Sequence, residues 1–135
     1  MKLIFCIDNK RGLEFNGRRQ SQDRALRARI LDLSKDSRLL MSAYSARQFD
    51  ECDKIVVDDS FMSSASNTDY CFVEGISPSL DGCDEVILYI WNRDYPADRY
   101  FEFDLGKLGF SLESIEDFSG YSHEKITEKI YKREK

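Results

Sequence analysis

Short apolar runs separated by polar stretches recur along the chain, and their length and β-branched content predict strands. Such runs cover residues 2–8, 38–43, 54–57, 70–73 and 85–91, and most are bounded by Gly, Asn, Asp or Ser residues that are typical of turns. The run from Glu85 to Trp91 is the most continuously apolar of them. We therefore expect it to lie inside a sheet, with a neighbouring strand on each side.

One amphipathic helix stands out by its periodicity. Leu26, Ile30 and Leu33 recur at i, i+4 and i+7, which places an apolar stripe on a helix that Ser21 could cap. A short helix is also predicted over residues 45–51, and a loop or short helix over residues 58–69. Because strands and helices alternate in this half of the chain, the pattern predicts one α/β domain over residues 1–135. Its central sheet is mixed, mostly parallel and flanked by a few helices.

Three polar or irregular segments give weaker patterns. Residues 9–20 are polar and are predicted to form a loop, with turns also at Ser77-Pro78 and Asp81-Gly82. Residues 112–118 alternate poorly, which predicts an edge or irregular strand. The last segment, residues 122–135, is rich in Glu and Lys and predicts a helix by local propensity.

Composition narrows the class of protein. The chain is 41% hydrophobic and 33% charged, its longest apolar run is far too short to span a bilayer, and no signal peptide is recognisable. Cys6, Cys52, Cys71 and Cys83 form no Cys-x-x-Cys pair, so reduced thiols and a cytoplasmic location are expected. A single histidine excludes a His-cluster metallohydrolase, and we expect neither a bound metal nor a cofactor.

Basic residues are concentrated in one segment. Residues 10–29 hold seven Lys or Arg against two acidic residues, whereas the whole chain carries a net charge of −5. This distribution favours a small anionic ligand or a partner protein near that segment and makes nucleic-acid binding a weak expectation. A solvated helix face would give the same pattern.

Several strings resemble dihydrofolate reductase. Residues 11–17 look like that family's flexible loop beside the substrate, Asp23 falls where its active-site carboxylate sits, and residues 41–45 occupy the place of its second strand and cofactor-binding helix. Residues 86–91, 98–101 and 120–123 are similar to its closing strands. The chain also resembles a group of small bacterial proteins that share strings such as residues 16–21 and 121–125.

The resemblance implies a shortened dihydrofolate reductase-like fold in which the final segment is a strand. It also implies that Asp23 is a buried proton donor whose pKa is raised by apolar walls. Read from the residues alone, Asp23 is instead a surface carboxylate in the first turn of a helix. Two departures argue against NADPH binding: Ser42-Ala43 stands where the family has Gly-Arg, and Glu74-Gly75 stands where it has two glycines.

Arginine and aromatic residues supply the candidate binding surface, because these residues are the usual anchors of interfaces. The candidates are Phe15, Arg18, Arg19, Arg24, Tyr95 and Tyr100. We therefore expect a non-catalytic protein of immunity-type or regulatory role that binds a partner protein or a small anionic ligand. The alternative is a divergent NADPH-dependent reductase that uses Asp23 and receives an anionic substrate at Arg18 and Arg19. His123 is expected at the surface or at a strand end, without a catalytic role.

Overall fold

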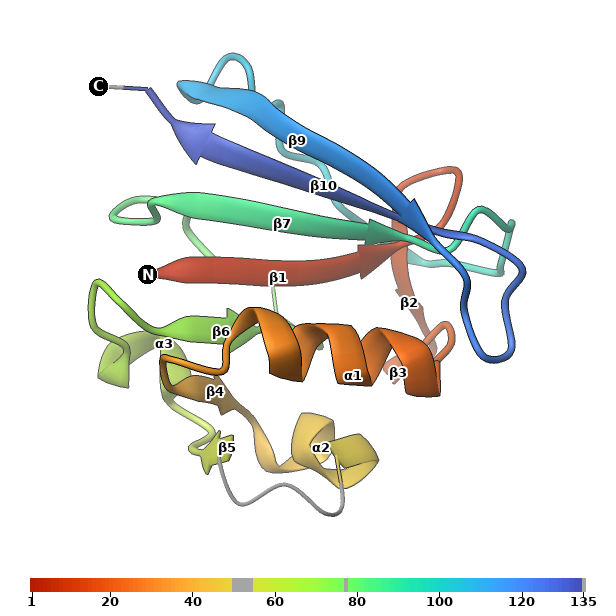
Figure 1. Cartoon of the computed structure of the whole chain (residues 1–135), viewed down its shortest axis with the longest axis horizontal. Coiled ribbons are helices and arrows are strands. Elements are labelled where there is room, and N and C mark those ends of the chain that lie inside the picture. The colour runs from red at the N-terminus through yellow and green to blue at the C-terminus, as the bar shows by residue number, and fades with distance from the viewer. Residues whose placement is uncertain (50–54, 77, 135) are drawn as a thin grey trace.

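The computed structural model describes residues 1–49, 55–76 and 78–134 and is built around a seven-stranded sheet (Figure 1). The strands lie in the order β5-β4-β6-β1-β7-β10-β9; the first five run parallel, and β10 and β9 run antiparallel to their neighbours. This confirms the predicted mixed, mostly parallel sheet. The strand bounds are β1 Lys2–Ile7, β4 Leu39–Met41, β5 Ile55–Val57, β6 Tyr70–Phe72, β7 Glu85–Ile90, β9 Phe110–Phe118 and β10 Ile126–Arg133.

The apolar run that begins at Glu85 forms β7, which lies inside the sheet as predicted. It pairs in parallel with β1 along its whole length, from Lys2 opposite Glu85 to Ile7 opposite Ile90, and β10 flanks its other side. The segment predicted to be an edge strand forms β9, which is the last strand of the sheet.

Helices cover the sheet unequally. α1 (Arg24–Leu33) buries Leu26 and Ile30, which pack on one face of the sheet against Ile4, Tyr89 and neighbouring side chains. Its N-cap is Asp23 rather than the predicted Ser21. The other helices are single turns: α2 (Ala43–Ala46), the 3₁₀ turn η1 (Arg47–Phe49) and α3 (Phe61–Ser64). The opposite face of the sheet carries a second apolar cluster, which contains Phe5, Leu88, Phe101 and Phe110.

The prediction of a loop over residues 9–20 is wrong. This segment forms β2 (Gly12–Phe15) and β3 (Arg18–Arg19), which pair antiparallel and join β8 (Arg99–Tyr100) in a three-stranded sheet. Asn16 and Gly17 make the turn with φ values of 53° and 72°. Both values lie in the left-handed region that a two-residue hairpin turn of this kind requires and that Asn-Gly favours. The small sheet lies beyond the carboxyl end of β1 (Figure 1).

The prediction of a C-terminal helix is also wrong, and the strand implied by the resemblance is confirmed. Residues Ile126 and Ile130 share one face of β10, because a spacing of four residues falls on one face of a strand as well as of a helix. Pairing with both β7 and β9 gives the backbone of β10 two sets of hydrogen bonds. Tertiary pairing therefore overrides the local helical propensity of the Glu and Lys residues.

Some predictions fall outside the described residues: the end of the helix over 45–51, the first residue of the strand over 54–57, part of the turn at 77–78, and Cys52. Among the described cysteines, Cys6, Cys71 and Cys83 are free thiols. Within the described ranges, no helix is long and apolar enough to cross a membrane. Nor do these residues gather three His, Cys, Asp or Glu side chains that could hold a metal ion.

Candidate functional site

The carboxylate of Asp23 is buried at the start of α1 and accepts hydrogen bonds from every side. Its donors are the backbone N–H groups of Ala25, Leu26, Tyr121 and Ser122, the Ser122 hydroxyl, and the His123 ring. Burial by itself would raise the pKa of Asp23, but these donors outweigh it and hold the pKa well below its usual range. Asp23 is 2% exposed, so the expectation of a surface carboxylate is wrong, whereas the burial that the resemblance implied is found. The pKa is shifted down, opposite to the direction that the resemblance implied.

His123 is the partner of Asp23 and is itself 3% exposed, so the expectation of a surface position is wrong. Its Nδ1 lies 2.8 Å from Asp23 Oδ2, and its ring stacks on Trp91 with the ring centroids 4.6 Å apart. Its Nε2 lies 3.1 Å from Ser21 Oγ and 2.9 Å from the Tyr95 hydroxyl. No sequence motif predicts this cluster, because its members come from three separate segments of the chain, residues 21–26, 91–95 and 121–123.

Ser21, His123 and Asp23 stand in the order of nucleophile, base and orienting acid that acyl-transfer enzymes use. Two features oppose that chemistry here. The Tyr95 hydroxyl shares the imidazole nitrogen that would have to take the proton of Ser21. The cavity beside Ser21 has a volume of about 20 Å³, which is room for one water molecule and not for an acyl substrate. The cluster therefore serves to join α1 to the segments that carry Tyr95 and His123.

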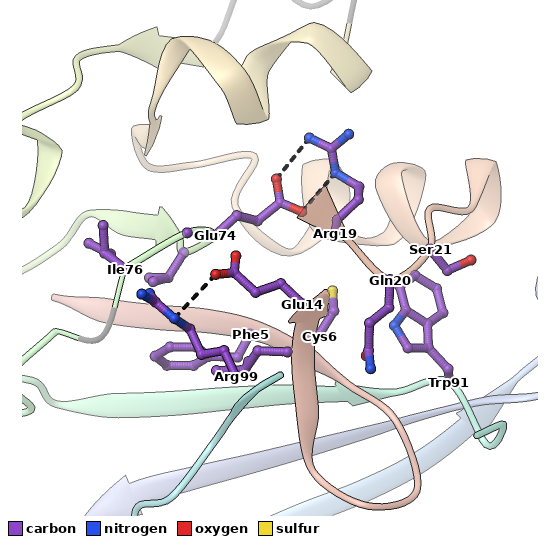
Figure 2. Close-up of a pocket in the computed structure, with 13 residues that line it drawn as sticks. Phe5, Cys6, Glu14, Arg19, Gln20, Ser21, Glu74, Ile76, Trp91 and Arg99 are labelled. Atoms are coloured by element: carbon purple, nitrogen blue, oxygen red, sulfur yellow. Dashed lines mark hydrogen bonds and ion pairs between the residues drawn. The ribbon is translucent and has the colours of Figure 1, made fainter. Parts of the chain in front are cut away.

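That cavity lies between the end of β1, the β2–β3 hairpin and the residues that follow β6 (Figure 2). Phe5, Cys6 and Trp91 are among its apolar lining, and burial raises the pKa of the Cys6 thiol. Gln20 also lines it, and its Oε1 is the one buried side-chain oxygen or nitrogen among the described residues that has no hydrogen-bond partner.

Two ion pairs close the cavity. Arg19 on β3 donates two hydrogen bonds to Glu74, at 2.9 and 3.0 Å, and Arg99 on β8 pairs with Glu14 on β2 at 3.2 Å. Figure 2 shows both pairs beside the cavity. The two carboxylate side chains are only 12% exposed. Because the Arg19–Glu74 pair joins the hairpin to the main sheet, the hairpin is fixed against the end of β6.

Four of the six predicted binding residues meet at the surface. Phe15, Arg18, Arg19 and Tyr95 line one open hollow of about 470 Å³, which we call the hairpin hollow. Its remaining lining residues are Asn16, Gln20 and Pro96.

The other two predicted residues lie apart. Tyr100 is on β8 of the small sheet, where its hydroxyl donates to the Ala97 carbonyl. Arg24 lies over the ring of Tyr121, with its Cζ 4.7 Å from the ring centroid, and lines a different hollow.

Comparison with known proteins identifies the architecture. A solved structure of dihydrofolate reductase from Enterococcus faecalis, complexed with NADP(H) and RAB-propyl, superposes with a TM-score of 0.69. The match covers 99% of this chain and 96% of that one, at 10% sequence identity. The chain has a dihydrofolate reductase-like fold. No protein-family profile and no curated protein sequence matches it.

The cofactor that the dihydrofolate reductase-like fold implies does not fit the residues present. Glu74 stands at the first of the two expected glycine positions, just after β6, where its carboxylate pairs with Arg19. At the start of α2, the backbone N–H of Ala43 already donates to Asp59 Oδ1 at 3.0 Å. The close backbone approach that the glycines would allow is therefore missing at the first place, and the Asp59 carboxylate at the second repels phosphate.

Proposed function

We propose that this chain is a non-catalytic binding protein that recognises an acidic segment of a partner protein through the hairpin hollow. The observation that carries the proposal is the meeting of Phe15, Arg18 and Tyr95 around one open surface. Phe15 is 42% exposed, and an exposed aromatic ring beside an arginine has the residue types of an interface anchor.

The hairpin hollow is held rigidly. The backbone N–H of Asn16 donates to Asp98 at 3.0 Å, and Gln20 Nε2 donates to Asp8 at 3.0 Å. The Arg19–Glu74 pair fixes the other strand of the hairpin. A preformed surface loses little conformational freedom on binding, so more of the contact energy appears as affinity.

The charge of the hollow favours an acidic partner. Arg18 is exposed and makes no ion pair within the part of the chain that the structure describes, so its guanidinium group has its donors available for a carboxylate. A partner that covers Phe15 and Tyr95 would exclude water from that ion pair and strengthen it. An immunity-type or regulatory role is consistent with such a surface and stays a prediction.

The reductase alternative has less support from the geometry. The hydrogen-bond donors around Asp23 lower its pKa, which disfavours a role as proton donor. Near the two places where the resemblance puts NADPH, Glu74 pairs with Arg19 and Asp59 accepts from the Ala43 N–H. No reaction is therefore assigned to this chain.

Affinity capture with matched variants tests the proposal. The wild type, the Phe15→Ala/Arg18→Ala double variant and a Lys107→Ala control are each immobilised and exposed to lysate of the natural host. We expect a protein retained by the wild type and by Lys107→Ala to be depleted about tenfold or more on the double variant. Identical sets of retained proteins on all three would exclude the hairpin hollow as the binding surface.

A further inference from the structure

Three arginines meet at a second hollow, on the α1 side of the Asp23 cluster. Arg24 and Arg27 come from the first turns of α1 and Arg47 from η1, and with Gln48 and Tyr121 they line an open space of about 400 Å³. We call this the arginine hollow. Arg24 and Arg27 lie in the basic segment over residues 10–29, and Arg24 is one of the six candidate binding residues. The sequence pattern does not include Arg47, because the chain separates it from the other two by 20 positions or more.

Among the residues that the structure describes, these three arginines have no carboxylate partner, a property that they share with Arg18. Arg19, Arg29 and Arg38 each pair with an acidic side chain. Across residues 1–49, 55–76 and 78–134, by contrast, neither Arg24, Arg27 nor Arg47 forms an ion pair. Among the described residues that line the hollow, the one acidic side chain is that of Asp23, and both of its oxygens are already engaged by buried donors. The described lining therefore carries an excess of positive charge.

That charge is unfavourable in the absence of an anion. The Asp23 carboxylate already caps the positive end of α1, but it does not pair with any of the three arginines. Three like charges around one hollow repel one another. An anion bound between them would relieve that repulsion.

Arg24 is oriented so that it can bind such an anion. The Cζ atom of its guanidinium group lies 4.7 Å from the centroid of the Tyr121 ring. The cation–π interaction with this ring holds the guanidinium group in place. The N–H donors project from the edge of the guanidinium plane, so stacking leaves them available for the paired hydrogen bonds that oxyanions accept. Tyr121 is 70% exposed, and the rest of its ring is open to a ligand.

We propose that the arginine hollow binds the phosphate group of a small phosphorylated molecule, with Tyr121 contacting the organic part. Three guanidinium groups offer more donors and more charge than one carboxylate can use, whereas a phosphate monoester presents three terminal oxygens and up to two negative charges. The hollow has the volume of a small-molecule site. This site is separate from the hairpin hollow, and neither proposal depends on the other.

Calorimetric titration with phenyl phosphate and with inorganic phosphate, at constant ionic strength, tests the site. We expect saturable one-to-one binding of phenyl phosphate, which Arg24→Gln, Arg27→Gln and Arg47→Gln each weaken about tenfold, the usual effect of losing a charged hydrogen bond. Tyr121→Ala should weaken phenyl phosphate and leave inorganic phosphate unchanged. Lys107→Gln, at an exposed position outside both hollows, is the control and should bind as the wild type does.

Several results would overturn the proposal. Among them are no saturation by phenyl phosphate up to about 10 mM, and equal losses in Lys107→Gln and the three arginine variants, which would indicate general charge attraction. A third result would be tight binding of a single-stranded oligonucleotide, with an affinity that falls steeply with salt, and no binding of phenyl phosphate. The ligand of the hollow would then be nucleic acid and not a small molecule. Thermal unfolding of the ligand-free variants checks that they are folded. Because each substitution removes an unpaired charge, we expect melting temperatures equal to or higher than that of the wild type.

Discussion

His123 Nδ1 lies 2.8 Å from Asp23 Oδ2, although 100 positions separate the two residues along the chain. The contact ties the connection between β9 and β10 to the first turn of α1. It also brings the backbone N–H groups of Tyr121 and Ser122 onto the same carboxylate. The conformation of the connection therefore depends on the negative charge of one side chain.

Asp23→Asn should lower the free energy of unfolding by about 3 kcal/mol, because the substitution leaves buried donors without a charged acceptor. Urea denaturation monitored by tryptophan fluorescence measures the change. Asp94→Asn, at an exposed position, is the control and should stay within about 0.5 kcal/mol of the wild type. If Asp23→Asn also stayed within about 0.5 kcal/mol of the wild type, the Asp23 carboxylate would not organise the connection between β9 and β10.

Asp69 should make stability depend on acid pH. Hydrogen bonds from Arg38 lower the pKa of this buried carboxyl to about 2, below the value near 3.9 of an unfolded chain. The ionised Asp69 therefore makes its full contribution to the free energy of unfolding above about pH 4, and this contribution is lost as the pH falls towards 2. Asp69→Asn should be less stable than the wild type at pH 7, with the difference shrinking across that interval. A difference independent of pH would contradict the assignment.

Gly120→Ala should disturb the Asp23 cluster directly. A methyl group at residue 120 would lie 2.6 Å from the His123 carbonyl oxygen and 2.8 Å from Asp23 Oδ2, so the connection would have to move. We expect a loss of about 1–3 kcal/mol. Gly106→Ala places its methyl 3.7 Å from the nearest heavy atom and should be close to neutral. Equal melting temperatures for the two variants would refute this account.

NADPH should not stabilise the protein. A ligand at 100 times its dissociation constant adds about 2.7 kcal/mol to the free energy of unfolding, which a thermal melt at millimolar NADPH detects easily. We expect no shift, because Glu74 and Asp59 occupy the positions where phosphates would approach. A shift of several degrees would restore the reductase alternative.

The main strands and α1 could be predicted from the sequence because their signals are local. Leu26 and Ile30 fall on one face of a helix whatever surrounds it, and the run from Glu85 is too apolar to lie anywhere but inside the sheet. Asn16-Gly17 is a recognisable hairpin-turn sequence. The polar residues around it nevertheless led to the prediction of a loop.

The rest could not be predicted, because it depends on contacts between distant segments. The state of Ile126–Arg133 is decided by its pairing with β7 and β9, and its local composition indicates the opposite. The environment of Asp23 is likewise made by Tyr121, Ser122 and His123, which no spacing rule connects to it. The meeting of Phe15 with Tyr95 follows from the pairing of β2 with β8.

The position of β10 has a consequence for how the chain acquires its structure during synthesis. β10 lies between β7 and β9 but is made after both of them. Until residues 126–133 have emerged from the ribosome, β7 is an unprotected edge with apolar residues on both faces, and β9 has no strand to pair with. Folding of the sheet therefore waits for residues 126–133, and chains that stall before residue 126 should be the ones that aggregate or need a chaperone.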